Sequence, residues 1–211
     1  MKYLMKLAVL FILLSCTQSP NAEKTLVAWV SLTDTVEMEG SVITIQDGER
    51  FDSIYLSAED GGKWIAGSEN NKRTQPEKGI PVQESDGEDL IQFAIVYTDS
   101  EIRMYRNGEL KSSYPARNID LLSSNKNFVL FGMDHFDGTA HMSEAIEDVR
   151  IYNRALTEPE LKLLQPNEAS KVTPYAWWDF EDEKLMERTG KFTYHNRYGL
   201  TFEGFELKEG K

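Results

Sequence analysis

The stretch AIEDVRIYNRALTEPELKLL, residues Ala145–Leu164, decides the fold class of this chain. Its first half alternates as a β-strand does, because successive side chains of a strand point to opposite faces. Val149 and Ile151 share one face of that strand. Ile146 and Tyr152 fall on the other face. The pattern therefore predicts a strand over the first half of the stretch.

The second half of the stretch predicts one capped helical turn. Thr157 and Glu160 have the spacing of a capping box, in which the glutamate side chain reaches back to the start of the helix. Gln165 precedes Pro166, and a residue before proline disfavours the helical conformation. We therefore expect the helix to end before this pair.

Short strand-like segments recur at regular spacing along the rest of the chain. They cover residues 25–32, 41–46, 51–56, 63–67, 91–97, 101–106 and 128–133. Asn107-Gly108 is a strong hairpin signal, because both central residues of a type I′ turn need positive φ. Many short strands with one helix indicate an all-β protein. Alternation on both faces favours a two-sheet antiparallel sandwich with one short C-terminal helix.

Two of these segments resemble a known family. The closing strand, followed by N-R-A-L and a short helix, is similar to the end of laminin-G-like, concanavalin A-like modules, where the strand has the form I-D-x-V-R-I-Y. The run IVYTDSEIRMYRNGELKSSY, residues 95–114, resembles the central meander of these modules. The resemblance covers residues 25–165 and implies a jelly-roll sandwich. It also implies a binding module, often for carbohydrate, of the kind attached to glycoside hydrolases and carried by bacterial surface lipoproteins.

The segment after the predicted helix allows two interpretations. Residues 166–174 are expected to form a linker. Within residues 175–211, the phrase YAWWDFED followed by ERTG resembles the opening of a further module of the same family. The segment either supplies closing strands to the first sandwich or starts a truncated second module. We prefer the second interpretation, because the last residues look like a strand with nothing after it to pair with.

Residues 1–15 predict a bacterial lipoprotein signal peptide. A short basic start precedes an apolar run that is too short to span a bilayer. The run ends in LLSC, which resembles a lipobox, so Cys16 would carry the lipid and residues 16–24 would form a polar tether. The alternative is an ordinary secretory signal with an incidental cysteine. Cys16 is the single cysteine of the chain, so no intramolecular disulfide is possible. We expect attachment to a membrane by the lipid anchor, at the outer membrane or cell surface.

Composition and motifs argue against several classes of function. The formal net charge is −12, from 23 Lys and Arg against 35 Asp and Glu. Such a balance disfavours nucleic-acid binding, because phosphate contacts need basic clusters. The chain has no G-x-S-x-G, H-E-x-x-H or G-x-G-x-x-G motif. It also lacks W-M-N-D-P-N-G, with which levanase-like fructosidases open their catalytic domain.

Three functions remain compatible with the sequence. The first is a non-catalytic extracytoplasmic module that binds polysaccharide or a surface glycan on a lipid-anchored protein. The second is the N-terminal accessory region of a larger glycoside hydrolase of the levanase type. The third is a structural domain that interacts with other proteins.

Sugar binding would use aromatic faces as stacking platforms, flanked by planar hydrogen-bonding groups. Trp64 is the first candidate platform, because it follows a Gly-rich tip. The candidate polar contacts that follow it are Asn70, Asn71 and Arg73. Further candidate contacts are Phe51, Tyr55, Tyr97 and His135. Each aromatic residue could instead belong to the core, and its truncation would then destabilise the fold.

One structural calcium ion is the cofactor that the resemblance suggests. Asp134 and Asp137 supply closely spaced oxygens in the expected loop DHFDG. Glu147 stands where the closing strand of the family often has aspartate. The alternative is that Asp134 and Asp137 shape the turn around Gly138.

Overall fold

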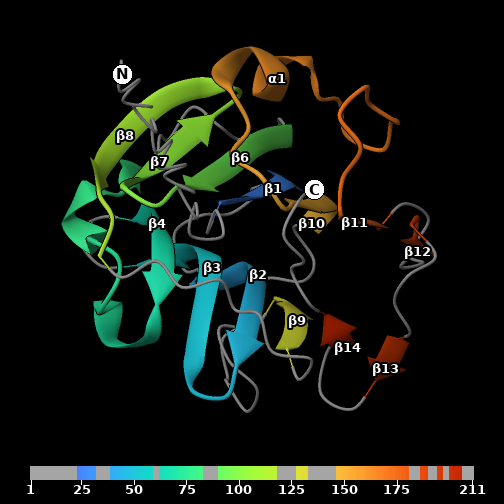
Figure 1. Cartoon of the computed structure of the whole chain (residues 1–211), viewed down its shortest axis with the longest axis horizontal. Helices are drawn as coiled ribbons and strands as arrows, with labels where there is room; N and C mark the ends of the chain where they lie inside the picture. Colours follow the sequence, from blue (N-terminus) through green and yellow to red (C-terminus); the bar gives the residue numbers. More distant parts are fainter. Residues whose placement is uncertain are drawn as a thin grey trace, which may run out of the picture.

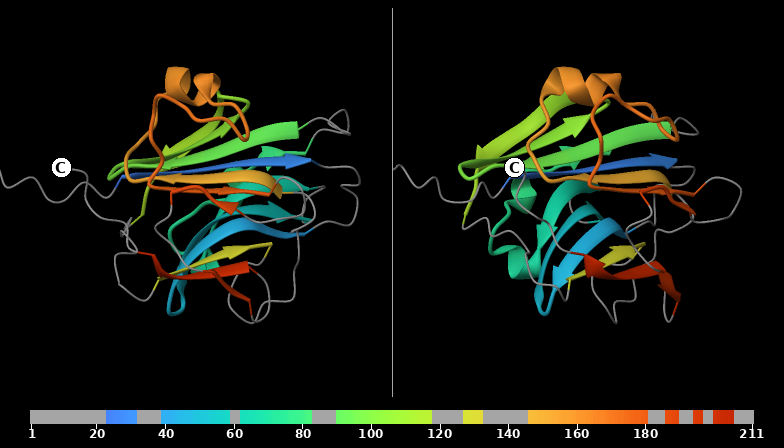
Figure 2. Two further views of the ribbon diagram at one scale, coloured as in Figure 1. Left: turned by 90° about the vertical axis from the view of Figure 1, so that its right-hand side faces the viewer. Right: turned by 45° about the vertical axis from the view of Figure 1, so that its right-hand side comes forward.

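The computed structural model describes residues 23–31, 39–58, 62–82, 90–117, 127–132, 146–180, 186–189, 194–196 and 200–205. These residues form two antiparallel sheets stacked face to face, each with seven strands. Figures 1 and 2 show the two layers, with the α-helix lying outside one of them. The predicted all-β sandwich with one short helix is confirmed.

Sheet A contains the closing strand. Its order is β12 (Met186–Glu187), β11 (Ala176–Asp179), β10 (Ile146–Tyr152), β1 (Lys24–Ser31), β6 (Leu90–Tyr97), β7 (Glu101–Arg106) and β8 (Glu109–Pro115). β1 lies between β10 and β6 and pairs with both. The first described strand is thus in the middle of the sheet, beside the closing strand.

Sheet B is the second layer. Its order is β13 (Tyr194–Asn196), β14 (Leu200–Phe205), β9 (Asn127–Phe131), β2 (Gly40–Asp47), β3 (Arg50–Ser57), β4 (Lys63–Ser68) and β5 (Ile80–Pro81). Two short 3-10 helices, η2 (Glu69–Asn71) and η3 (Pro76–Lys78), connect β4 to β5.

Aromatic pairs join the two sheets across the core. Trp64 of β4 stacks on Phe93 of β6, with ring centroids 4.1 Å apart. Phe131 of β9 meets Trp178 of β11 edge to face at 5.1 Å. Both are arrangements that aromatic rings favour, and all four side chains belong to one buried apolar cluster.

The closing strand follows the predicted alternation except at its first residue. Val149 and Ile151 are fully buried between the sheets, and Tyr152 lies in a separate apolar cluster on the outer face of sheet A. Simple alternation predicts Ile146 on the side of Tyr152, but the structure places it in the inter-sheet core. The register between β1 and β10 shifts there and leaves Glu147 as the extra residue of a bulge. A bulge interrupts the alternation and turns Ile146 to the other face.

Helix α1 (Glu158–Leu163) covers the outer face of sheet A (Figure 2). The predicted capping box is confirmed, since Glu160 accepts hydrogen bonds from the backbone N–H and the hydroxyl of Thr157 at 2.8 and 2.9 Å. Hydrogen bonds from Arg154 and then from Thr157 lower the pKa of Glu160 to about 2. No helix of the described segments is long and apolar enough to cross a membrane.

A charged side chain is enclosed beneath the segment that follows α1. Arg150 of β10 is fully buried and donates hydrogen bonds of 2.9 and 2.8 Å to the two carboxylate oxygens of Asp148. Its guanidinium lies 4.9 Å from the ring centroid of Trp29 and 4.5 Å from that of Trp177. It also donates to the carbonyl oxygen of Gln165 at 2.7 Å. The paired charge and the two flanking rings compensate for the loss of hydration.

The predicted hairpin at Asn107-Gly108 is confirmed. These two residues connect β7 to β8, and their φ angles are 50° and 72°. Both values are in the left-handed region, as a type I′ turn requires. The left-handed conformation is tolerated best by glycine and then by asparagine.

The preferred interpretation of the C-terminal segment is corrected by its pairing. β11 pairs with β10, and β14 pairs with β9, so the segment adds strands to both sheets of the same sandwich. Ala176 and Trp178 of β11 are fully buried in the inter-sheet core. The sandwich therefore extends beyond residue 165, because its core takes apolar side chains from the later segment.

Truncating Ile151 should destabilise the protein more than removing the helix cap does. Ile151→Ala leaves a cavity at a fully buried site and should lower the free energy of unfolding by about 2–4 kcal/mol. Thr157→Ala should cost about 1 kcal/mol, the usual effect of losing an N-cap. Urea denaturation of the two variants measures both values. The reverse order would contradict the core position of β10.

Candidate functional site

A shallow depression opens on the outer face of sheet B, over β3 and β4; we call it the β3–β4 depression. Ile54 and Leu56 of β3 point into the core, so alternation sends Phe51 and Tyr55 to the outer face. The depression has a volume of about 230 Å³. It is lined by Glu39, Phe51, Tyr55, Ser57, Ile65, Gly67, Ser68, Asn71 and Pro76.

Gly67 forms the floor of the depression. A Cβ atom at this position would lie 2.2 Å from Ser53 Oγ and 3.4 Å from Tyr55 Cβ, so side chains of β3 lie close to Gly67. Phe51 and Tyr55 are both half-buried beside this floor. Ser53 Oγ is buried and has no hydrogen-bond partner among the described residues. Two aromatic side chains thus border the floor at Gly67, with the polar Ser53 Oγ close to it.

Polar groups stand on the rim. The Tyr55 hydroxyl donates a hydrogen bond of 2.8 Å to Glu39 Oε1, which fixes the position of that ring. Asn71 is exposed and lines the depression, in a left-handed conformation with φ of 54°. Asn70 is exposed next to it, with φ of 48°, but does not belong to the lining. Of the predicted amide contacts, the structure therefore brings Asn71 to the site and leaves Asn70 beside it.

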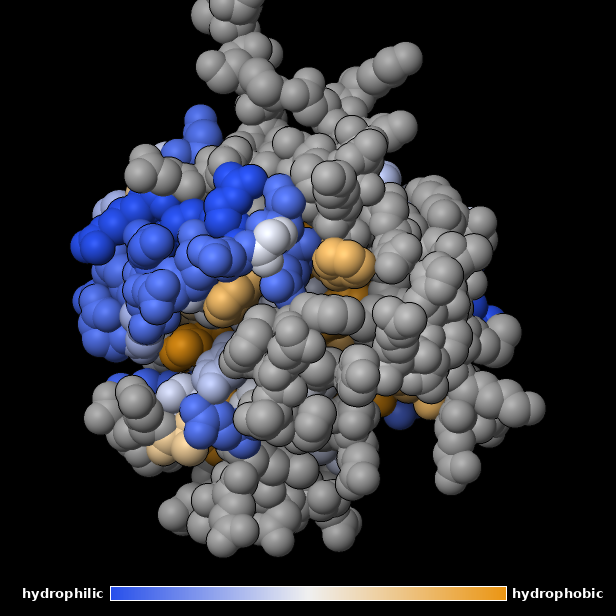
Figure 3. All heavy atoms as spheres, turned by 90° about the horizontal axis from the view of Figure 1, so that it is seen from below, coloured by the Kyte–Doolittle hydropathy of each residue, from blue (hydrophilic) through white to orange (hydrophobic). Residues whose placement is uncertain are grey.

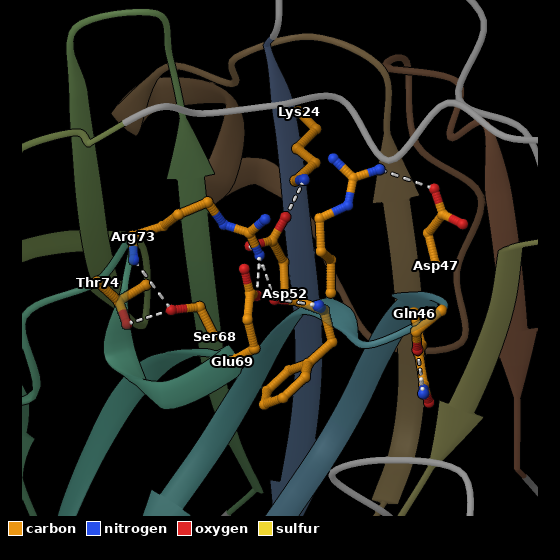
Figure 4. A network of polar contacts seen from close by, with 11 residues as sticks. Lys24, Gln46, Asp47, Asp52, Ser68, Glu69, Arg73 and Thr74 are labelled. Atoms are coloured by element: carbon orange, nitrogen blue, oxygen red, sulfur yellow. Dashed lines mark hydrogen bonds and ion pairs between the residues drawn. The ribbon is translucent and has the colours of Figure 1, made fainter.

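Arg73 supports this rim from inside the protein. Only 6% of it is exposed, and its Nη2 lies 2.8 Å from Asp52 and 2.9 Å from Glu69 (Figure 4). The same nitrogen donates to the carbonyl oxygen of Phe51. These contacts hold η2, and with it Asn71, against β3. The prediction that Arg73 binds a ligand is corrected, because its guanidinium is engaged by protein groups and enclosed.

Asp52 has a second cationic partner on the other sheet. Lys24 of β1 forms an ion pair with Asp52, and both side chains are buried (Figure 4). The ammonium group lies 4.8 Å from the ring centroid of Tyr97. One carboxylate thus connects β1 of sheet A, β3 of sheet B and the segment that carries η2.

The sequence profile of the concanavalin A-like lectin/glucanases superfamily matches residues 11–162, well over half of the chain. The chain belongs to this superfamily. The resemblance of the closing strand and the meander is therefore confirmed.

Several solved structures are similar to this chain. A candidate carbohydrate-binding protein from Bacteroides ovatus has a TM-score of 0.52 and 12% identity, over 86% of this chain and 51% of that one. This member of the superfamily thus spans about half the length of that protein. Domain 4 of AbnA, an extracellular arabinanase of Geobacillus stearothermophilus in complex with arabinotriose, has a TM-score of 0.46 and 16% identity, over 68% and 66% of the chains. The CBM40 module of a Ruminococcus gnavus sialidase, bound to α2,6-sialyllactose, has a TM-score of 0.48 and 16% identity, over 66% and 81%.

No curated protein matches the chain. The similarity to the Bacteroides ovatus structure shows the fold alone, and the chemistry of the site has to come from the residues themselves.

Two aromatic residues predicted as sugar contacts belong to the core of this superfamily member. Trp64 is 2% exposed and packs face to face on Phe93, so a ligand has no access to its ring. Tyr97 is 1% exposed, and burial raises the pKa of its hydroxyl well above the ordinary value. Both positions follow the inward phase of their strands. The predictions for Trp64 and Tyr97 are corrected in favour of the core interpretation.

The remaining predicted residues divide into two groups. Cys16, Asp134, His135 and Asp137 lie outside the described residues. Glu147 is half-buried, and its Oε1 accepts a hydrogen bond of 2.7 Å from Asn167. Within the described ranges, no group of three His, Cys, Asp or Glu side chains could hold a metal ion. The calcium site stays a prediction.

Six residues that line the depression were missed by the sequence analysis: Glu39, Ser57, Ile65, Gly67, Ser68 and Pro76. Ser57 and Gly67 share the outward phase of the hairpin with Phe51 and Tyr55, so alternation along β3 and β4 would have found them. Glu39 precedes β2, and only the folded structure brings it to Tyr55.

Trp64→Ala should act on stability, because the ring fills the core between the sheets. We expect the free energy of unfolding to fall by about 3–5 kcal/mol, the usual range for truncation of a buried tryptophan. Leu163→Ala is the control, since 76% of Leu163 is exposed on α1. Thermal and urea melts compare the two. A melting temperature of Trp64→Ala equal to that of the control would place Trp64 outside the core.

Proposed function

We propose that this chain is a non-catalytic carbohydrate-binding module, with the β3–β4 depression as its binding site. The observation that carries the proposal is the pair of half-buried side chains Phe51 and Tyr55 on either side of the floor at Gly67. The C–H face of a sugar ring is apolar, so it packs on aromatic side chains. Its hydroxyl groups then lie at the edge, within reach of rim groups such as those of Asn71, Ser57 and Glu39.

The size of the depression suits contact with a single sugar ring or the end of a glycan chain. Its volume of about 230 Å³ is below the roughly 300–1,000 Å³ of sites that enclose drug-sized ligands. An open site of this size would contact a single ring or the end of a chain. We therefore expect weak binding, with the strength of attachment to a polysaccharide coming from repeated contacts along the polymer.

The number of carboxylates that line the depression favours binding over hydrolysis. Glycosidases place two carboxyl groups on either side of the scissile bond. Of the described residues that line the depression, Glu39 is the one carboxylate, and it is hydrogen-bonded to Tyr55. The similar protein from Bacteroides ovatus is described as a candidate carbohydrate-binding protein, which agrees with this proposal.

A glycan array followed by calorimetry on the best ligand tests the site. Tyr55→Ala and Phe51→Ala should each weaken binding roughly tenfold, which corresponds to about 1.4 kcal/mol of lost aromatic contact. Leu163→Ala, on the far side of sheet A, should bind as the wild type does. Melting temperatures of all variants show whether the fold is intact.

Unchanged affinity in the Tyr55 and Phe51 variants would move the site elsewhere. Absence of binding to every glycan on the array would favour the third function, a structural protein-interaction domain. Turnover of any bound glycan by the wild type would instead support the second function, a part of a glycoside hydrolase.

We further propose that Cys16 is lipidated and holds the module at the outer membrane or cell surface. The LLSC tetrad after an apolar run motivates this proposal. Metabolic labelling with a fatty-acid analogue should mark the wild type and leave Cys16→Ser unlabelled. Membrane fractionation should then find the wild type in the membrane and Cys16→Ser in the soluble fraction, because several acyl chains are needed for stable attachment. Equal labelling of both proteins would contradict lipidation.

A further inference from the structure

A second groove lies at the edge of the sandwich, between the β7–β8 turn and the segment of η3 and β5; we call it the edge groove. Its volume is about 580 Å³, and it shares no lining residue with the β3–β4 depression. Figure 3, a view from below that of Figure 1, shows that much of the described surface on its left side is hydrophilic. The side chains that matter to its chemistry are Lys78, Arg106, Asn107, Glu109, Lys111 and Ser112.

The edge groove is positively charged in an acidic protein. Three cations, Lys78, Arg106 and Lys111, line it together with one carboxylate, Glu109. Glu109 accepts a hydrogen bond of 2.8 Å from Lys111, which is the first cause of its lowered pKa, and Lys162 adds to the effect. Lys111 thus pairs with this carboxylate, while Lys162, which is bonded to Glu158 at 2.7 Å, acts on it only from a distance. Among the described residues that line the groove, three cations thus stand against one carboxylate, although the chain carries a net charge of −12.

Arg106 is the cation that the fold holds most firmly. It is 8% exposed, and its guanidinium lies 6.0 Å from the ring centroid of Phe93, which itself stacks on Trp64. Burial also lowers the pKa of Arg106, because a guanidinium withdrawn from water loses part of its hydration. An anion brought into the groove would gain more from such a guanidinium than from one in open water.

A glycine in each wall of the edge groove lets that wall pack closely against a neighbouring element. A Cβ atom at Gly79 would lie 2.6 Å from Ile65 Cγ2 and 2.9 Å from the carbonyl oxygen of Trp64, so this wall is pressed against β4. A Cβ atom at Gly108 would lie 2.9 Å from the backbone of Lys162, so the opposite wall is pressed against α1. The walls are therefore placed before a ligand arrives, which reduces the entropic cost of binding.

We propose that the edge groove binds the carboxylate or sulfate group of an acidic saccharide. Arg106 and the two lysines would hold the anionic group, and the amide of Asn107 and the hydroxyl of Ser112 would contact sugar hydroxyls. Double-stranded nucleic acid carries one negative charge about every 1.7 Å, which this acidic chain would repel. A polysaccharide with one negative charge per sugar has a lower charge density than nucleic acid, and this density matches the three cations of the groove better. The proposal goes beyond the β3–β4 depression, since it needs neither Phe51 nor Tyr55.

Paired polymers that differ only in charge test this proposal. Affinity electrophoresis at low salt compares polygalacturonate with its methyl ester, and dextran sulfate with dextran. We expect retardation by at least one acidic polymer over its neutral counterpart, and weaker retardation as salt screens the charges. Lys78→Gln combined with Lys111→Gln should weaken binding of that polymer roughly tenfold. Lys171→Gln, an exposed lysine away from the groove, is the matched control.

Results from these gels and from a vesicle-binding assay could overturn the proposal. Equal retardation by acidic and neutral polymers, or an equal loss in Lys171→Gln, would show that the groove does not select the charge. Binding confined to vesicles containing phosphatidylglycerol would assign the cations to a membrane surface instead. Unchanged melting temperatures of the variants show that a loss of binding is local. If the β3–β4 depression at Phe51 and Tyr55 binds no neutral glycan, the comparison of the groove variants on the acidic polymer still tests the edge groove.

Discussion

The buried carboxylate of Asp52 is the interaction on which the arrangement of this protein depends. It receives Lys24 from sheet A and Arg73 from the segment after β4, and all three side chains are withdrawn from water. Removing one partner of such a cluster leaves an uncompensated charge and typically costs about 3–5 kcal/mol. The cluster therefore ties together the two sheets and η2. Through Arg73 it also fixes the rim of the β3–β4 depression.

The two sheets use their outer faces differently. α1 and the residues around it bury the outer face of sheet A with an apolar cluster that includes Trp29 and Leu161. The enclosed pair of Arg150 and Asp148 lies on that same face. On sheet B, the outward side of β3 and β4 carries half-buried aromatic residues and a bare glycine. A covered face stabilises the fold, and an open face with aromatic rings is available for recognition.

The two proposed sites differ in the chemistry that they offer to a glycan. The β3–β4 depression presents apolar ring faces, which recognise the shape and the C–H surface of a sugar. The edge groove presents cations, which recognise charge and depend on ionic strength. They lie on different parts of the same rigid sandwich. A polysaccharide that carries both neutral and acidic units could therefore engage both, and two weak contacts on one polymer would add to each other.

The sequence by itself determined the local elements, because their causes lie within a few residues. Alternation indicated the strands, Asn107-Gly108 indicated its turn, and Thr157 with Glu160 indicated the start of α1. The family followed from the closing strand and the meander for the same reason. These signals act between neighbours along the chain, so no knowledge of distant contacts was needed.

Only the tertiary structure decided which faces are covered and where a ligand has access. Alternation says that Trp64 and Tyr55 lie on opposite faces of their hairpin, but it does not say which face meets the other sheet. The bulge at Glu147 and the entry of β11 and β14 into the two sheets depend on pairing between segments far apart in sequence. The sequence pattern suggested Arg73 as a ligand contact, but in the folded protein its guanidinium is paired with Asp52. Exposure is a property of everything that packs around a residue, and so it is decided only when distant segments meet.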